Sequence, residues 1–172
     1  GVPADYAAAA TAARALAERN TDKLRLGGIK LIGDGSLQGW TACCSHPGYF
    51  TGEDHGLAQF TDDDLNLAVK TFHEAGLQIF CHANGDASAD QFINAVDLAL
   101  RDYAWLDHRH TVQHSQVTRA AQYRRMATLG IAANIFTNHI WYWGDQHYEQ
   151  VMGPERVERM WACRSAMEAG VS

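Results

Sequence analysis

Ionisable side chains stand at or near the carboxyl ends of four short, apolar segments that we predict to be strands. Lys30 lies in the first segment, His82 ends the second, His114 ends the third, and His139 follows the fourth. In parallel α/β folds, the carboxyl ends of the strands meet at one edge, and the loops beyond them carry function. Imidazole is the commonest metal ligand in proteins. Two histidines at successive strand ends therefore favour a metal site.

Side-chain alternation along a strand supports a shared cavity for the two histidines. Phe80 and His82 fall on one face of their strand, and Val112 and His114 fall on one face of theirs. We therefore expect both rings to point in a common direction. The alternative interpretation is that each ring is buried separately and satisfied by a backbone carbonyl.

Lys30 needs a different chemistry to join such a site. An ammonium group has only donors and a positive charge, so it cannot bind a metal. Addition of CO₂ to the deprotonated amine would give an anionic carbamate that can bridge two cations. The simpler alternative is an ion pair between Lys30 and Asp34.

The remaining sequence predicts alternating helices and strands. We expect helices at 3–19 and 61–76, one capped by Ser88 and Gln91, one from Thr118 to near Gly130, and a last one beginning at Pro154. We expect strands at 29–32, 77–82, 110–114 and 131–135, and a long loop at 33–60. This order predicts a parallel sheet. Four such strands fit either a small doubly wound sheet or half of an eight-stranded βα barrel.

Composition narrows the class of protein. The chain has 172 residues, a net charge of −6 and 47% hydrophobic residues, and no basic stripe that would indicate a nucleic-acid partner. We expect no membrane partner, because no apolar run approaches the roughly 20 residues of a membrane helix. The four cysteines form no CxxC pair, so we expect reduced thiols and a cytoplasmic location.

Four segments, in order, resemble the YtcJ-like branch of the amidohydrolase superfamily, often called amidohydrolase family 3, which includes N-substituted formamide deformylase. Residues 28–42 are similar to its "GG-K-DGS-TA" segment, and residues 82–86 to its "HANGD" segment. His114, Ser115 and Gln116 are similar to its "H-(A/S)-Q" segment. Residues 139–145 and 153–156 are similar to the part that follows strand seven.

The resemblance implies a metal-dependent hydrolase on a TIM-type (β/α) barrel, with a small-molecule substrate. Lys30 would be a carbamylated ligand, and His82 and His114 would be further ligands of a divalent metal, for which zinc suits best. The activated water would attack an amide or formamide C–N bond. Candidate catalytic residues are His139 and Asp34. Candidate substrate-binding residues are Trp40, Asn84, Asp86, His139 and Trp143, although Trp143 equally fits a core or interface aromatic cluster.

The chain also departs from the family pattern. The family's first strand carries a His-x-His pair and its eighth strand an Asp base, whereas here that spacing occurs only in His108-Arg109-His110, at the position of strand six. We therefore interpret residues 1–172 as one partial barrel domain of strands four to seven: a helix at 1–20, a strand and active-site loop at 28–60, and further βα units at 61–172. We expect little activity from it alone.

Two other hypotheses remain open. The chain could be a non-catalytic half-barrel that is stabilised by homo-oligomerisation, since half a barrel exposes two sheet edges. It could also be a free-standing α/β sheet with a Lys/His acid–base site. Separation of Lys30 and His82 to opposite ends of the sheet would exclude both the acid–base site and the metal site.

Overall fold

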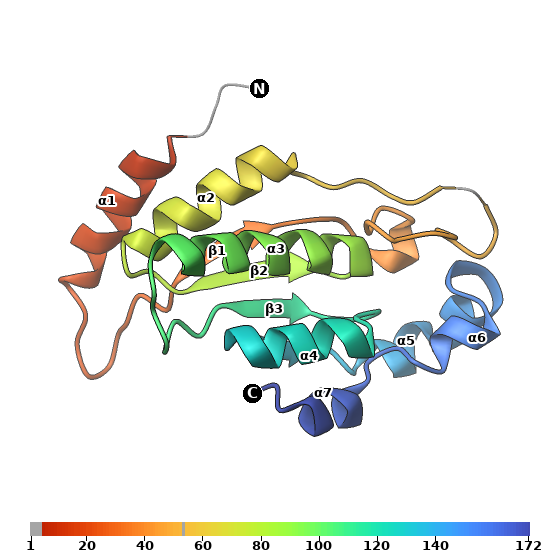
Figure 1. Ribbon diagram of the computed structural model, residues 1–172. Helices are drawn as coiled ribbons and strands as arrows, with labels where there is room; N and C mark the ends of the chain where they lie inside the picture. Colours follow the sequence, from red (N-terminus) through yellow and green to blue (C-terminus); the bar gives the residue numbers. More distant parts are fainter. Residues whose placement is uncertain (1–4, 53) are drawn as a thin grey trace.

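A four-stranded parallel sheet forms the centre of the computed structural model, which describes residues 5–52 and 54–172 (Figure 1). The strands are β1 (Ile29–Ile32), β2 (Ile79–Ala83), β3 (Thr111–His114) and β4 (Ala132–Ile135), in the spatial order β1-β2-β3-β4. Every neighbouring pair is parallel. The predicted alternation of strands and helices is therefore confirmed.

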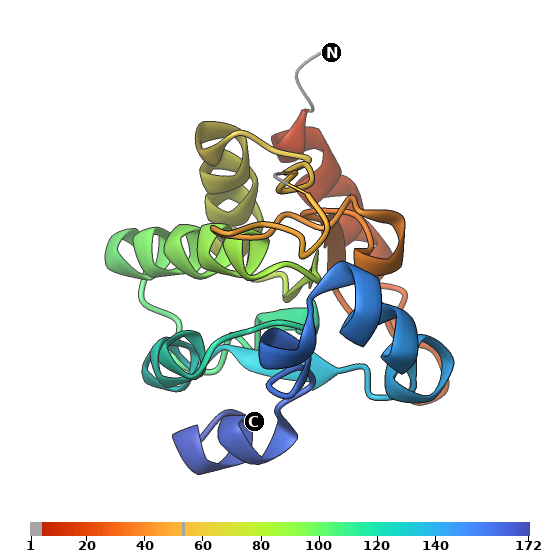
Figure 2. The same ribbon diagram turned by 90° about the vertical axis from the view of Figure 1, so that its right-hand side faces the viewer.

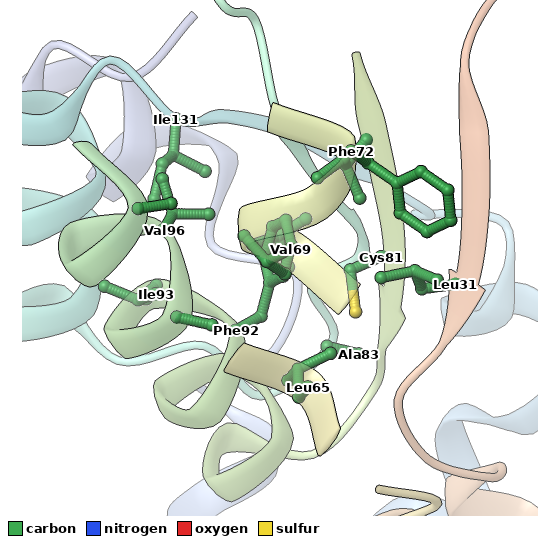
Figure 3. Packing of buried hydrophobic residues seen from close by; sticks show 14 of the residues in the cluster. Leu31, Leu65, Val69, Phe72, Cys81, Ala83, Phe92, Ile93, Val96 and Ile131 are labelled. Atoms are coloured by element: carbon green, nitrogen blue, oxygen red, sulfur yellow. The ribbon is translucent and has the colours of Figure 1, made fainter. Parts of the chain in front are cut away.

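Three helices connect the strands and lie side by side along one face of the sheet (Figures 1 and 2). They are α2 (Asp62–Glu74), α3 (Asp86–Asp102) and α4 (Ala120–Leu129). Leu31, Cys81 and Val112 are aligned across the ladder and point into this helical layer. Figure 3 shows the core that results, in which Val69 and Phe92 pack close to the strand residues. Burial of these apolar side chains is the main stabilising contribution of the layer.

The opposite face of the sheet has a different character. Lys30 and Phe80 are paired across the ladder, as are Ile32 and His82, and then His82 and Gln113. Lys30 is exposed, and Ile32 is 48% exposed. The chemistry-bearing residues of β1 and β2 therefore lie on the face away from the three crossover helices.

The first two helices follow their sequence signals. Helix α1 (Tyr6–Ala17) begins after Asp5, whose carboxylate accepts a hydrogen bond from Ala8 N at 2.9 Å. The helix predicted at 3–19 is thus confirmed in its centre, and residues 3 and 4 lie outside the described residues. Thr61 caps α2 as predicted, since Thr61 Oγ1 accepts from Asp64 N at 3.2 Å.

Two predicted helix starts were wrong. Helix α3 begins at Asp86 after Gly85, so Ser88 lies inside its first turn, and Gln91 instead donates to Phe60 O. Helix α4 begins after Arg119, while the Thr118 hydroxyl accepts from Ser115 Oγ at 2.7 Å. The Ser88 hydroxyl is buried without a hydrogen-bond partner, and the Thr118 hydroxyl is used by Ser115 within the preceding turn, so neither side chain caps its helix.

The segment after β4 differs most from expectation. Residues to which no helix or strand was assigned form α5 (His139–Gln146) and a π-helical turn, η2 (His147–Val151). The single helix predicted from Pro154 is two helices, α6 (Pro154–Val157) and α7 (Cys163–Ala169). Trp161 lies between them and has a left-handed φ of 49°. This conformation is outside the right-handed helical region, so one regular helix cannot continue through Trp161.

A second apolar cluster holds the long loop at 33–60 against the region from η2 to the residues after α6. Among the described residues of this loop, the one regular element is the short 3₁₀ turn η1 (Leu37–Gly39). The buried members of the cluster come from both segments: Leu37, Ala42, Cys44, Tyr49, Val151, Met152, Met160 and Trp161. This cluster lies beyond the carboxyl ends of the strands (Figure 1). Within the described residues, none of the helices has the length and apolar character needed to span a bilayer.

Candidate metal and substrate site

The rings of His82 and His114 meet at the carboxyl end of the sheet. Their centroids are 4.6 Å apart and their planes are inclined by 70°. His82 is the fourth residue of β2, and His114 is the last residue of β3. The structure thus brings together the two histidines that the sequence placed in one cavity.

Side-chain alternation along the strands does not explain why the rings of His82 and His114 meet. The ladder pairs His82 with Gln113 and pairs His114 with the buried Ala83, which belongs to the helix-covered face. His114 has a φ of +75°, and Ser115 follows with +48°. This left-handed backbone turns the His114 side chain toward His82 at the strand end. The expected alternation of Val112 and His114 on one face is therefore wrong, although the predicted meeting is confirmed.

His114 is poised as a neutral imidazole. Burial, together with the nearby charges of His82, Lys30 and His139, lowers its pKa to about 4. The lone pair on one ring nitrogen is consequently free at neutral pH. Neutral imidazole is the form that binds metal ions.

Lys30 lies close enough to His114 for its charge to act on that ring. It is on the strand next to His82 and on the same sheet face, so the two residues are not at opposite ends of the sheet. Burial lowers the pKa of Lys30. The alternative ion pair of Lys30 with Asp34 is not formed among the described residues, and His82 Nε2 instead lies 3.4 Å from Asp34 Oδ1.

Asp34 fastens three chain segments together, in an arrangement that we call the Asp34 clasp. Its buried carboxylate accepts hydrogen bonds from the backbone N–H groups of Cys43 (3.0 Å), Asn84 (3.0 Å) and Gly85 (2.8 Å). Burial raises the pKa of Asp34, while these donors and His82 oppose that rise. The saturated carboxylate acts here as a structural acceptor, so its candidate role as a catalytic residue stays a prediction.

His82 also contacts the backbone. Its Nε2 atom lies 2.8 Å from Gly35 O and 3.0 Å from Asn84 Nδ2. The carbonyl contact is the structural role considered as an alternative for this residue. Its role as a metal ligand stays a prediction.

A chain of amides links this region to His139. Asn84 donates to Gly35 O at 2.7 Å, and its Oδ1 accepts from Gln116 Nε2 at 2.7 Å. Gln116 Nε2 also lies 3.0 Å from His139 Nδ1. Burial lowers the pKa of His139. Asn84 and His139 therefore belong to one polar network beside His82, and their predicted contact with a substrate stays a prediction.

Two residues at this network, Gln116 and Phe136, were given no role from the sequence alone. Gln116 is almost fully buried between Asn84 and His139, and the motif His114-Ser115-Gln116 was the available signal for it. Phe136 packs edge to face with His114 at 5.8 Å and with His139 at 4.6 Å. No local pattern identifies Phe136, because its importance comes from the neighbours that the fold provides.

Asp86 is buried, and its partners explain its burial. Its Oδ1 atom accepts from Ser45 N at 2.8 Å, its Oδ2 atom accepts from the Ser45 hydroxyl, and Arg119 Nε lies 3.2 Å from Oδ2. These contacts tie the 33–60 loop to the starts of α3 and α4. Asp86 also lines a cavity of about 560 Å³ together with Arg119 and Arg156.

The two tryptophans occupy different surroundings. Trp40 is partly buried against the second apolar cluster and ends η1 with a left-handed φ of 53°. Trp143 is 39% exposed on α5, and its neighbour Trp141 is 87% exposed. Direct contact of either tryptophan with a substrate stays a prediction.

The protein side chains alone do not complete a metal cage. Across residues 5–52 and 54–172, no three or more His, Cys, Asp or Glu side chains are grouped so that they could hold an ion. Two imidazoles and a lysine of lowered pKa nevertheless make a donor set that fits part of a divalent-metal site. A carbamate on Lys30 would supply the anionic oxygens that this set lacks.

The comparison with known families decides the class. The Amidohydrolase family matches residues 2–172, almost the whole chain. The chain belongs to the amidohydrolase family. Protein LONG AFTER FAR-RED 3 of Arabidopsis thaliana is 26% identical over 117 residues, and YtcJ of Bacillus subtilis (strain 168) is 26% identical over 113 residues. These matches cover 68% and 65% of this chain but only 20% and 21% of the two relatives.

Solved structures place this amidohydrolase segment in a larger fold. An uncharacterised metal-dependent hydrolase from Pyrococcus furiosus superposes with a TM-score of 0.76 at 21% identity, over 94% of this chain and 34% of that one. A second, from Pyrococcus horikoshii, gives a TM-score of 0.75 at 21% identity, over 93% and 32%. The fold is therefore the predicted set of parallel βα units of a TIM-type barrel.

Proposed function

We propose that this chain carries part of the active site of a metal-dependent hydrolase that acts on C–N bonds of the amide or formamide type. The observation that carries the proposal is the meeting of His82 and His114 beside Lys30 at the carboxyl end of the sheet. Family membership and the hydrolase neighbours support it. In this proposal residues 1–172 form one partial barrel domain, located in the cytoplasm.

The ligands would be His82, His114 and a carbamylated Lys30, and the ion would be zinc or another divalent metal. The chemistry that such an ion supplies when bound is Lewis acidity, which lets water attack a carbonyl near neutral pH. The lowered pKa of Lys30 supports the modification, since only the uncharged amine adds CO₂. The low pKa of His114 supports its role, since protons then compete weakly for its lone pair.

His139 would orient the substrate. Gln116 Nε2 donates to His139 Nδ1, which places the ring proton on Nε2, where it can donate to a substrate oxygen. Phe136 packs against the His139 ring and limits its rotation. Trp40, Trp143, Asn84 and Asp86 would shape the surrounding small-molecule pocket, with Asp86 acting through its hold on Ser45 and Arg119.

Calorimetric titration of the chain with Zn²⁺ in bicarbonate buffer tests the metal proposal. We expect binding by the wild-type chain and a loss of at least tenfold in affinity for Lys30→Ala and His82→Ala. His46→Gln, which removes an exposed histidine, is the matched control and should bind as wild type. Equal affinity of all four proteins would exclude these ligands.

Two further measurements complete the test. With ¹³C-bicarbonate, a carbamate carbon signal should appear in the wild-type chain and vanish in Lys30→Ala. An assay with an N-substituted formamide should give little turnover, because the family's His-x-His pair and Asp base are not among these residues. Robust turnover by this chain would disprove the need for those groups.

A second candidate function is a non-catalytic half-barrel stabilised by homo-oligomerisation. It is favoured by the sheet, in which β1 and β4 each pair on one side only, and by exposed apolar side chains such as Ile32 and Trp141. Unpaired strand edges are templates for association. Sedimentation should then show a dimer or larger species, whereas a monomer at micromolar concentration would contradict this candidate.

A further inference from the structure

Three buried histidines form a second cluster, separate from the site above. His73 lies near the end of α2, and His108 and His110 precede β3. All three are essentially inaccessible to solvent. They lie at the amino-terminal end of the sheet. His108 and His110 have the His-x-His spacing, which has no role in the metal proposal.

Hydrogen bonds to fixed backbone groups determine where the ring protons are. Ile79 N–H donates to His110 Nδ1 at 3.1 Å, so the proton of a neutral His110 is on Nε2. That N–H points at His73 Nδ1, 2.9 Å away. His73 must then carry its own proton on Nε2, which donates to Tyr103 O at 2.7 Å.

The third ring follows the same logic. His110 N–H donates to His108 Nδ1 at 2.9 Å, and His108 Nε2–H donates to Leu129 O at 2.8 Å. All six ring nitrogens therefore have a partner, and the cluster is satisfied with each ring neutral. A further proton on any Nδ1 would face an N–H donor, so every protonation must break a hydrogen bond.

We propose that this buried histidine cluster is an acid-sensitive switch, which joins α2, β2 and the end of α4 only while all three imidazoles are neutral. His73 comes from α2, the Ile79 amide from β2 and the Leu129 carbonyl from the end of α4, so the bonds cross between elements. Protonation would release the amino-terminal end of the sheet. The site at the opposite end does not enter this proposal.

The charged and titratable surroundings favour neutrality. The groups that face the cluster are the rings of Tyr103 and Trp105 and, near His108, the carboxylate of Asp107. The Leu129 carbonyl and Asp107 favour a charged His108, and Asp107 is paired at the surface with Arg109 at 2.7 Å. Burial and the mutual repulsion of the rings prevail, lowering the pKa of His110 to about 2 and also lowering that of His108.

The direction of the pH effect follows from these shifts. Unfolded histidine has a pKa of about 6.5, so below that pH the unfolded chain binds more protons than the folded chain. The stabilisation is complete above about pH 6.5 and is lost as the pH falls toward the folded values. A cavity of about 290 Å³, lined by Trp105 and His108 among others, gives water a route to the cluster.

Urea unfolding of the intact chain between pH 5 and 7 tests the switch. We expect the unfolding equilibrium constant to rise by up to about tenfold per pH unit for each of His108 and His110 below pH 6. His108→Gln keeps a donor and an acceptor without a titrating ring, and should reduce the slope by about one proton. The exposed control His46→Gln should keep the wild-type slope. An unchanged slope in His108→Gln would overturn the proposal.

Nitrogen NMR of the wild-type rings gives a readout that does not depend on a variant's folding. For His108 and His110 we expect neutral Nε2–H tautomers at pH 7 that persist in the folded protein at pH 5.5. Titration of these rings near pH 6.5 in the folded state, or an Nδ1–H tautomer, would contradict the switch.

Discussion

The rings of His82 and His114 meet edge to face, although the strand register shifts the two residues by one position relative to each other. The register pairs His82 with Gln113, and only the left-handed backbone of His114 turns its ring to the same side. The left-handed backbone at the end of β3 is thus needed to form the site. A residue with regular extended backbone at position 114 would direct its side chain toward the helices.

Substitutions at residue 114 should separate this backbone role from the role of the ring. Asparagine tolerates positive φ, whereas valine is strongly disfavoured there. We expect His114→Asn to lose Zn²⁺ affinity at least tenfold with little loss of stability, and His114→Val to lose about 1–3 kcal/mol of unfolding free energy as well. Calorimetric titration and urea unfolding measure the two effects. A stable Val variant would refute the backbone role.

The pKa of His114 also predicts how metal binding depends on pH. With a pKa of about 4, this ring competes with protons only as the pH approaches 4. We therefore expect the His114 contribution, measured as the affinity ratio of wild type to His114→Asn, to be constant between pH 8 and about 5 and then to fall. A ratio that falls between pH 7 and 6 would show an ordinary, solvated histidine.

Asp34→Ala should be severely destabilising. The substitution leaves the buried amides of Cys43, Asn84 and Gly85 without their acceptor, and each buried donor left unpaired costs about 1–3 kcal/mol. We expect a loss of about 3 kcal/mol or more in urea unfolding. Asp22→Ala, at an exposed carboxylate, should change stability by less than about 0.5 kcal/mol. Equal effects would contradict the Asp34 clasp.

Two glycines should respond in opposite ways to alanine. A Cβ on Gly85 would lie 1.8 Å from Cys43 O, so Gly85→Ala must displace the 33–60 loop and should cost about 3 kcal/mol or more. Gly144 lies inside α5 with no atom within 4 Å of an added Cβ. Gly144→Ala should stabilise the chain by about 0.5–1 kcal/mol, because alanine favours the helix. Thermal unfolding of both variants measures the contrast.

The helical layer offers a matched pair on α3. Phe92 is fully buried among core residues (Figure 3), so Phe92→Ala should cost about 3–5 kcal/mol. Leu98, on the same helix, is 46% exposed, and Leu98→Ala should cost less than about 1 kcal/mol. Denaturant unfolding measures both losses of unfolding free energy. Similar losses would contradict the placement of Phe92 in the core.

Local signals predicted the helical crossovers well where periodicity and capping agreed. The α2 helix has an apolar stripe, a Thr61 cap and a glycine with positive φ at Gly76, and its limits match within two residues. The α5 helix was missed because none of its residues is buried, so it has no apolar periodicity. The break at Trp161 was missed because its left-handed backbone depends on packing in the second apolar cluster.

The site was predictable in its residue types but not in its contacts. Motifs placed His82 and His114 at strand ends and Lys30 within the neighbouring strand, and the fold brings the two rings together with Lys30 on the same sheet face. The bonds that position them are tertiary: Asp34 binds distant amides, and Gln116 bridges Asn84 and His139. Such partners have no signature in local sequence.

The Asp34 clasp has a consequence for how the chain folds. Its bonds to Asn84 and Gly85 span 50 and 51 residues, so they can form only after β2 has docked beside β1 and the intervening loop has closed. Because this loop closure costs entropy before the bonds can form, we expect the clasp to form after the folding transition state. We therefore expect weakening of the clasp to speed unfolding while leaving the folding rate nearly unchanged. The lifetime of the folded site would then depend on one carboxylate.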